Sequence, residues 1–207
     1  MSDELPGQEL LFISARVQSV GELYARIMAK FELGALIDGP TLRAWLMTAW
    51  ADARVVIAFL TNRSSGGKYK NQRVAIFMAG WKPPDKQLRR RLDDHHETAT
   101  HHVAHLFQQT DVSGGFDYQM PYDIVDAVDS LVAEMDERGD DLADQAASLR
   151  SAAIRARACL DDPIQWAQLA DIVSLESLAE QLGLDRSAGS HPQLRRALAL
   201  RSIPRSS

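Results

Sequence analysis

Apolar residues recur at three- and four-residue steps through most of this chain, and that spacing restricts the fold more than any other feature. Residues three and four apart lie on one face of an α-helix, so each such stretch predicts an amphipathic helix. The stretches cover about residues 8–34, 40–61, 85–109 and 122–158. We therefore expect an all-α protein, a four-helix up-down bundle followed by a short C-terminal helical appendage. We assign residues 8–158 to the bundle domain and residues 159–207 to the C-terminal helix and basic tail.

Glycine and proline mark where these helices should begin and end. Gly34 is expected to close the first helix, and Pro40 suits the first turn of the second because its missing N–H is not needed there. The fourth stretch either continues through Gly139 or ends there and restarts after it. The segment VAIFMAGW, residues 74–81, is compatible with either a helical turn or a buried strand.

Cysteine usage and hydropathy bear on where the protein works. The chain has one cysteine, Cys159, which excludes an internal disulfide framework and a Cys-rich zinc module. The N-terminus MSDELPGQEL carries acidic residues where a signal peptide has basic ones. No apolar run approaches the roughly 18 to 20 residues that span a bilayer. We expect a cytoplasmic protein without a membrane segment.

Charge is distributed unevenly along a chain whose net charge is −5. Residues 63–91 carry nine basic side chains and one acidic side chain, a net charge of +8. A local positive field of this kind attracts phosphate groups or acidic proteins, and the other interpretation is a solvated basic loop. The candidate nucleic-acid contacts are Lys68, Lys70, Arg73, Arg89 and Arg90.

Five of the six histidines fall within residues 95–105. At about 100° per residue, a helix here places His95 and His102 at the edge of the buried stripe. It places Glu97, His101 and His105 on the opposite, exposed side. Those three have the i, i+4 spacing that can chelate a metal, which is one hypothesis for the cluster. A site on an exposed face would lack a supporting second layer of hydrogen bonds, so we expect no metal and no cofactor.

The order of elements resembles the HEPN superfamily, in particular its abortive-infection-like branch, over about residues 9–158. The apolar segment LRAWLMTAWADARVVIAFLTNR is followed by a basic loop and then by HHVAHLFQQ, which looks like the histidine-centred segment of that family. After a Gly-rich loop, YDIVDAVDSLVAEMDE looks like its last helix. The resemblance implies a helical bundle that forms a homodimer, with metal-independent ribonuclease activity in its catalytic members.

The catalytic motif of that family is an arginine and a histidine separated by four to six residues. Carried onto this sequence, it falls on Arg91 and His96, while His105 best matches the histidine of the family. On an unbroken helix Arg91 and His96 point about 140° apart, so they could not converge on one phosphate. No arginine stands at the motif distance before His105. The pattern indicates a degenerate member that binds rather than cleaves.

These observations predict a catalytically degenerate HEPN-like protein that binds RNA or an acidic protein partner, in phage defence or toxin–antitoxin biology. Three other hypotheses stay open. The chain could be a metal-independent HEPN ribonuclease, a metal-binding bundle built on the histidine cluster, or a purely structural interaction protein. If it is an enzyme, a ribonuclease is the class that the resemblance implies.

Overall fold

The computed structural model describes residues 6–34, 37–62, 74, 78–105, 117–139 and 143–168. Regular structure within these ranges is helical, with no strand, which confirms the all-α class. None of the described helices combines the length and the apolar character needed to cross a membrane. The long helices are α1 (Pro6–Glu32), α2 (Gly39–Leu60), α4 (Lys86–His105), α5 (Gln119–Arg138) and α6 (Ala143–Asp161).

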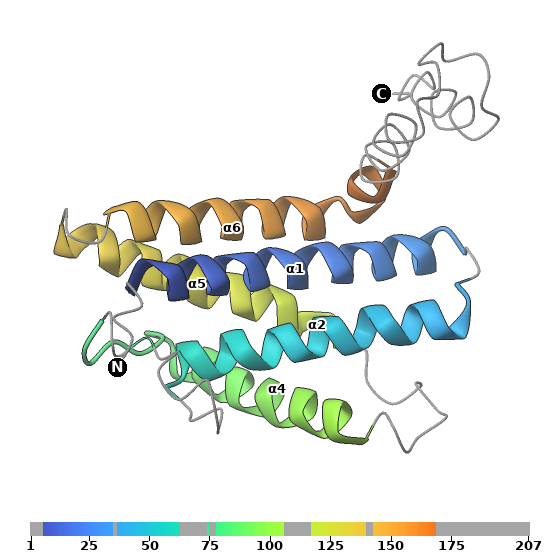
Figure 1. Ribbon diagram of the computed structural model, residues 1–207, viewed down its shortest axis with the longest axis horizontal. Helices are drawn as coiled ribbons and strands as arrows, with labels where there is room; N and C mark the ends of the chain where they lie inside the picture. Colours follow the sequence, from blue (N-terminus) through green and yellow to red (C-terminus); the bar gives the residue numbers. More distant parts are fainter. Residues whose placement is uncertain are drawn as a thin grey trace, which may run out of the picture.

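The helices are arranged around α1 and α5. α1 packs between α2 and α6, and α2 packs in turn against α4. α5 lies behind this row, where it packs on α6 and α4 and also touches α1 and α2 (Figure 1). The colours in Figure 1 show that α1, α4 and α6 run in one direction across the view and α2 and α5 in the other. The polar residues described below lie where α4 meets the start of α5.

The sequence left open whether residues 122–158 form one helix or two, and the structure has two. α5 ends at Arg138, and Gly139 follows with a φ of 101°, a backbone angle that glycine adopts without strain. After this turn α6 lies along α5 and α1. The described residues therefore hold five long helices, one more than predicted, because α6 is a separate element rather than a continuation.

Two helix starts are fixed by aspartate caps. The Asp38 carboxylate accepts a backbone N–H from the first turn of α2 at 2.9 Å, and Pro40 lies in that turn as predicted. The Asp85 carboxylate accepts the N–H groups of Gln87 and Leu88 at 2.8 and 3.2 Å at the start of α4. The first turn of α4 contains no acidic residue, so Asp85 supplies the negative charge that this helix end favours.

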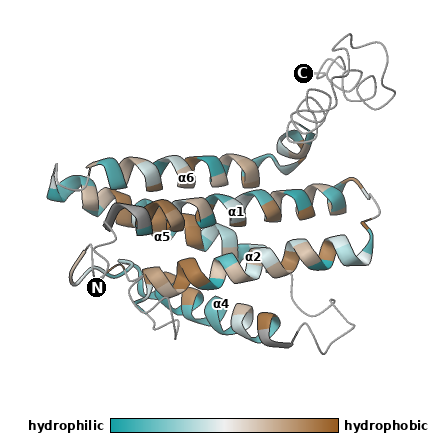
Figure 2. Cartoon of the chain, in the orientation of Figure 1, coloured by the Kyte–Doolittle hydropathy of each residue, from teal (hydrophilic) through white to brown (hydrophobic). Residues whose placement is uncertain are grey.

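The hydrophobic core is formed by the inward faces of all five helices. Figure 2 shows hydrophobic residues concentrated along α5 and along the C-terminal part of α2. Trp50 and Tyr24 are among the largest fully buried side chains. Val74 and Met78, from the segment that the sequence left unassigned, join this core. The Met78 N–H donates to the Val74 carbonyl at 2.7 Å, the i to i−4 bond of a helical turn rather than of a strand.

Gly21 of α1 lies directly against Ala156 of α6. A Cβ atom added there would lie 2.6 Å from both the Cα and the Cβ of Ala156, much closer than carbon atoms pack in proteins. The Ser148 hydroxyl donates to the Ser14 hydroxyl at 3.0 Å across the same pair of helices. The contact between α1 and α6 therefore depends on small residues.

α6 also carries the one cysteine of the chain. Cys159 is fully buried, and this burial raises the pKa of its thiol to about 12. At neutral pH the thiol is therefore protonated and shielded from solvent.

The predicted domain boundary at residue 158 falls within the last turn of α6, which ends at Asp161. Residues 163–168 form a further short helical piece, from which Trp166 lies 5.3 Å from the Arg155 guanidinium. The rest of the predicted appendage, residues 169–207, lies outside the described residues.

Candidate functional site: an ion-pair network between α4 and α5

α4 is one unbroken helix, and its inward face follows the predicted stripe. Leu88, Leu92 and Ala99 on this face are buried. His95 shares the face and is 7% exposed. A buried polar ring requires hydrogen-bond partners, and those of His95 come from the beginning of α5.

Asp123 of α5 is the centre of a polar network, and its side chain is completely buried. The Arg91 guanidinium donates two hydrogen bonds to it, from Nε to Oδ2 at 2.8 Å and from Nη2 to Oδ1 at 3.0 Å. Gln119 Nε2 donates to Oδ1 at 3.1 Å, and His95 Nε2 lies 2.9 Å from Oδ2. Four contacts to one buried carboxylate replace the water that burial removed.

His95 lies between two carboxylates. Its Nε2 contacts Asp123, while its Nδ1 lies 2.8 Å from Oδ2 of Asp117, the residue just before Tyr118 and α5. A neutral imidazole has one N–H, so both ring nitrogens can face carboxylates favourably only in the imidazolium form. With Arg91 the network then holds two positive and two negative groups, and its net charge is zero.

The pKa values of the network reflect this pairing. Burial lowers the pKa of His95, but the contacts with Asp117 and Asp123 outweigh it and raise the pKa above the usual 6.5. The contact with His95 lowers the pKa of Asp117. Burial raises the pKa of Asp123, but the bonds from Arg91, His95 and Gln119 outweigh burial and lower it. The pairing therefore favours the charged form of each of the four groups.

Aromatic groups border the network. His102, two turns along α4, stacks on Trp50 of α2 with ring centroids 4.2 Å apart and an angle of 14° between the planes. Burial lowers the pKa of His102, and the nearby His101 lowers it further. Burial also raises the pKa of Tyr24 on α1, and the negative charge of Asp117 adds to this effect. The predicted edge positions of His95 and His102 are both confirmed.

The arrangement joins two helices and is poorly suited to metal binding. The two carboxylates approach opposite edges of the His95 ring, so imidazole and carboxylates do not converge on one point as a metal requires. Within the part of the chain that the structure describes, no group of three or more His, Cys, Asp or Glu side chains has the geometry to hold a metal ion.

The structure does not bring Arg91 and His96 of the predicted catalytic set together. Arg91 is bound to Asp123, whereas His96 is partly exposed and five residues further along the same helix. A continuous helix turns these two side chains in different directions, so they do not meet within one chain. His105 is the last residue of α4, and its side chain lies outside the described residues.

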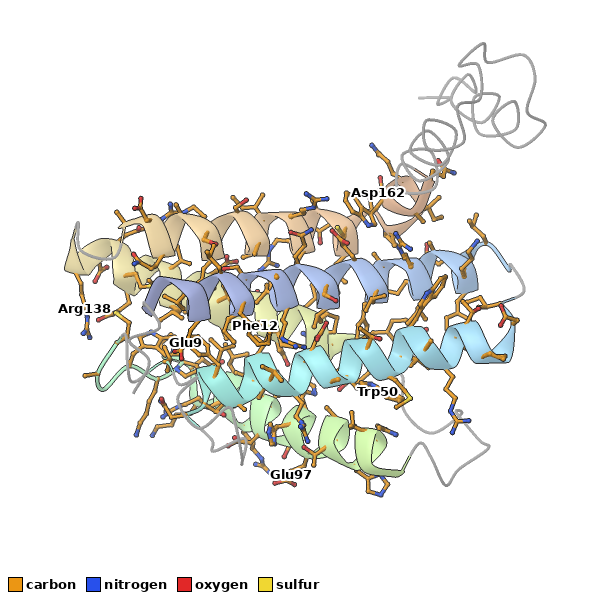
Figure 3. The ribbon with its side chains drawn as sticks, in the orientation of Figure 1. Glu9, Phe12, Trp50, Glu97, Arg138 and Asp162 are labelled. Atoms are coloured by element: carbon orange, nitrogen blue, oxygen red, sulfur yellow. The ribbon has the colours of Figure 1, made fainter. Side chains whose placement is uncertain are left out.

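The other predicted residues are spread over the outside of α4. Glu97 and His101 are exposed, and Figure 3 shows Glu97 on the side of α4 that faces away from the other helices. Arg90 is exposed, and Arg89 is half-buried with a buried Nε that has no hydrogen-bond partner. The remaining predicted contacts, Lys68, Lys70 and Arg73, lie outside the described residues.

The sequence reasoning missed Asp117, Gln119 and Asp123, which supply the α5 half of the network. A signal for Asp123 was available, because it lies on the same helical face as Met120, Ile124 and Ala127. A carboxylate in an apolar stripe requires a partner, and the matching residue is the histidine in the apolar stripe of α4.

The pKa values predict how stability depends on pH. His95 has a raised pKa, so its contribution is fully present below pH 6.5 and is lost as the pH rises through the folded value. Asp117 and Asp123 have lowered pKa values, so their contribution is present above 3.8 and is lost as the pH falls through the folded values. Urea unfolding from about pH 3 to about pH 9 should show stability falling at both ends.

The variant His95→Gln isolates the alkaline part of that prediction. His102 has a lowered pKa and gains stability as the pH rises, so it partly masks the loss from His95 in the wild type. The difference between wild type and His95→Gln removes the contribution of His102. This difference should shrink as the pH rises above 6.5, and a difference independent of pH would contradict the assignment.

Comparison of the chain with protein-family models, with curated proteins and with solved structures finds no match in any of the three.

Proposed function

We propose that this protein is a catalytically degenerate HEPN-like bundle that binds nucleic acid through the basic segment of residues 68–91, in phage defence or toxin–antitoxin biology. In this proposal α1, α2, α4 and α5 correspond to the four HEPN-like helices, and α6 is an added helix along α1. The HEPN resemblance implies a homodimer, which light scattering on the purified protein would test.

The observation that carries the proposal is the pairing of Arg91. The catalytic motif requires an arginine available to a phosphate, but Arg91 gives two hydrogen bonds to the buried Asp123. The proposed role of Arg91 is therefore to hold α5 against α4. Its partner in the motif, His96, belongs to a different face of the helix.

Binding is favoured over catalysis by the basic residues that remain exposed. Lys82, Lys86 and Arg90 are exposed around the start of α4, and no described residue forms an ion pair with any of them. Of these, Lys86 lies in the first turn of α4, where a positive charge opposes the helix dipole and costs a few tenths of a kcal/mol, up to roughly 1 kcal/mol. Local stability does not explain the position of Lys86, whereas attraction of a phosphate backbone does.

Fluorescence anisotropy with a labelled single-stranded RNA, titrated at several KCl concentrations, tests the proposal. The wild type should bind, with log affinity falling linearly with log salt. The double variant K86Q/R90Q removes two positive charges, so the slope should become shallower by about 1.4 and low-salt affinity should fall several-fold.

The matched control places the same change in net charge elsewhere. Ala143 and Ser151 are exposed on α6, so A143E/S151E also lowers the net charge by two without touching α4. This variant should bind RNA with the wild-type slope. Absence of RNA binding by the wild type at low salt would refute the proposal, and binding of an acidic polypeptide instead would favour an acidic protein partner. RNA that is shortened during the assay, with the shortening abolished by His96→Ala, would restore the ribonuclease hypothesis.

A further inference from the structure

We propose that His95 is a protonation-dependent clamp, which holds the start of α5 against α4 as an imidazolium and releases Asp117 when it becomes neutral. This inference rests on the geometry around the ring and does not depend on nucleic-acid binding. The two carboxylates that flank His95 differ in how firmly they are held, and this difference decides which contact opens.

The Asp123 contact is the fixed half of the clamp. The Asp123 side chain has no solvent exposure, and it is bound by Arg91 through two hydrogen bonds and by Gln119 through one. Moving this carboxylate would leave a buried charge without donors. When His95 is neutral, its one remaining proton should therefore stay on Nε2, facing Asp123.

The Asp117 contact is the releasable half. The Asp117 side chain is 35% exposed, and its other bonds are local ones to the first turn of α5, in which it accepts the Gln119 N–H at 2.9 Å and a backbone hydrogen bond from Met120. When Nδ1 loses its proton, a nitrogen lone pair faces a carboxylate oxygen across 2.8 Å, which is a repulsive contact. Solvent is already within reach of Asp117, so rotation towards water removes the repulsion.

The charged groups that act on His95 keep their charge over the pH range in which His95 titrates, so His95 is the group whose protonation state changes. Asp117, just before α5, and Asp123 of α5 are the carboxylates that act on the ring, and both stay ionised above neutral pH. On α4 itself, Arg91 is committed to Asp123 and remains charged. His102 stacks on Trp50 of α2 instead.

The remaining titratable groups that could act on His95 come from α1 and α2. The buried carboxylate of α2, Asp52, pairs with Arg16 of α1 rather than with His95. Tyr24 of α1 lies close enough to Asp117 for that charge to raise the pKa of its phenol, so Tyr24 stays neutral in the range where His95 titrates. No described residue on these two helices competes for the His95 proton.

Opening the clamp would change the entry of the chain into α5. Asp117 immediately precedes Tyr118, whose side chain is 51% exposed. With Asp117 released, Asp123 and Gln119 still anchor the first turn of α5, so the helix persists while the residues just before it gain freedom. The expected change is therefore local rather than a general unfolding.

Nuclear magnetic resonance of the full chain, with the histidine rings and backbone amides followed against pH, tests the clamp. In the wild type, His95 should titrate above pH 6.5, and the Gln119 amide that donates to Asp117 should shift with the same midpoint. A Gln119 amide that is insensitive to the His95 titration would overturn the proposal without any variant.

The variant Asp117→Asn distinguishes the role of Asp117 in the clamp from its role in capping α5. Asparagine caps a helix start about as well as aspartate, and its amide can face Nδ1 in either protonation state. The variant should therefore lower the His95 midpoint and abolish the coupled shift of the Gln119 amide. Asp38→Asn makes the same change at the cap of α2, where no described histidine is in contact, and should leave both signals unchanged. An unchanged His95 midpoint in Asp117→Asn would show that Asp117 does not take part in the clamp.

Discussion

Replacing Asp123 with alanine is expected to lower the free energy of unfolding by about 3 kcal/mol. Removing one partner from a buried ion pair typically costs roughly 3 to 5 kcal/mol, because the other charge stays buried without compensation. The lower end applies here because the Arg91 side chain is 41% exposed and can turn towards water. His95, at 9% side-chain exposure, has less freedom to do so and would give up its proton instead.

Asp126→Ala is the matched control, since it is the same substitution on the same helix. Asp126 is exposed and pairs with Arg157 of α6 at 2.6 Å, and exposed pairs of this kind contribute about 1 kcal/mol or less. Urea unfolding measured at neutral pH gives both values. A loss of similar size in the two variants would mean that burial does not make the Asp123 network more important than a surface pair.

Gly21→Ala is expected to destabilise the protein by about 2 kcal/mol, although alanine is the better helix former. The gain in helix propensity is about 1 kcal/mol. Against it, the new Cβ would meet the backbone Cα of Ala156 at 2.6 Å, so α1 and α6 must separate. Overpacking of this kind costs about 1 to 3 kcal/mol, and a backbone contact that no rotamer can relieve belongs at the upper end.

Thermal and urea unfolding would check this prediction beside Gly39→Ala. Gly39 is the first residue of α2 and nothing lies within 4 Å of the Cβ position there, so alanine should cost much less than at Gly21, apart from the small steric cost of a Cβ in a helical residue before Pro40. The double variant G21A/A156G should recover part of the loss, because it removes the Cβ of residue 156 but leaves its Cα in place. Gly21→Ala with a stability at or above that of the wild type would show that the two helices separate at little cost.

The course of α4 could be predicted from the sequence because it depends on local spacing. The periodic apolar residues gave its inward face, and the same calculation put His95 and His102 at the edge of that face, where the structure has them. The choice at Gly139 could not be made from spacing, because glycine suits both a helix end and a short irregularity. The packing of α6 along α1 decided it.

The network itself could not be predicted, because its two halves are far apart in the sequence. Arg91 and His95 reach Asp123 across 32 and 28 residues, and no local pattern specifies which helices meet at which turn. The residue that acts with Arg91 is His95, one helical turn away on the same face, rather than His96.

The buried thiol of Cys159 makes this protein convenient for site-directed labelling. Because that thiol is protonated and inaccessible at neutral pH, maleimide reagents should not modify it in the folded chain. A cysteine introduced at Tyr118, whose side chain is exposed, would then be the single reactive position. A fluorophore or spin label there would report directly on motion at the beginning of α5 without prior removal of the native cysteine.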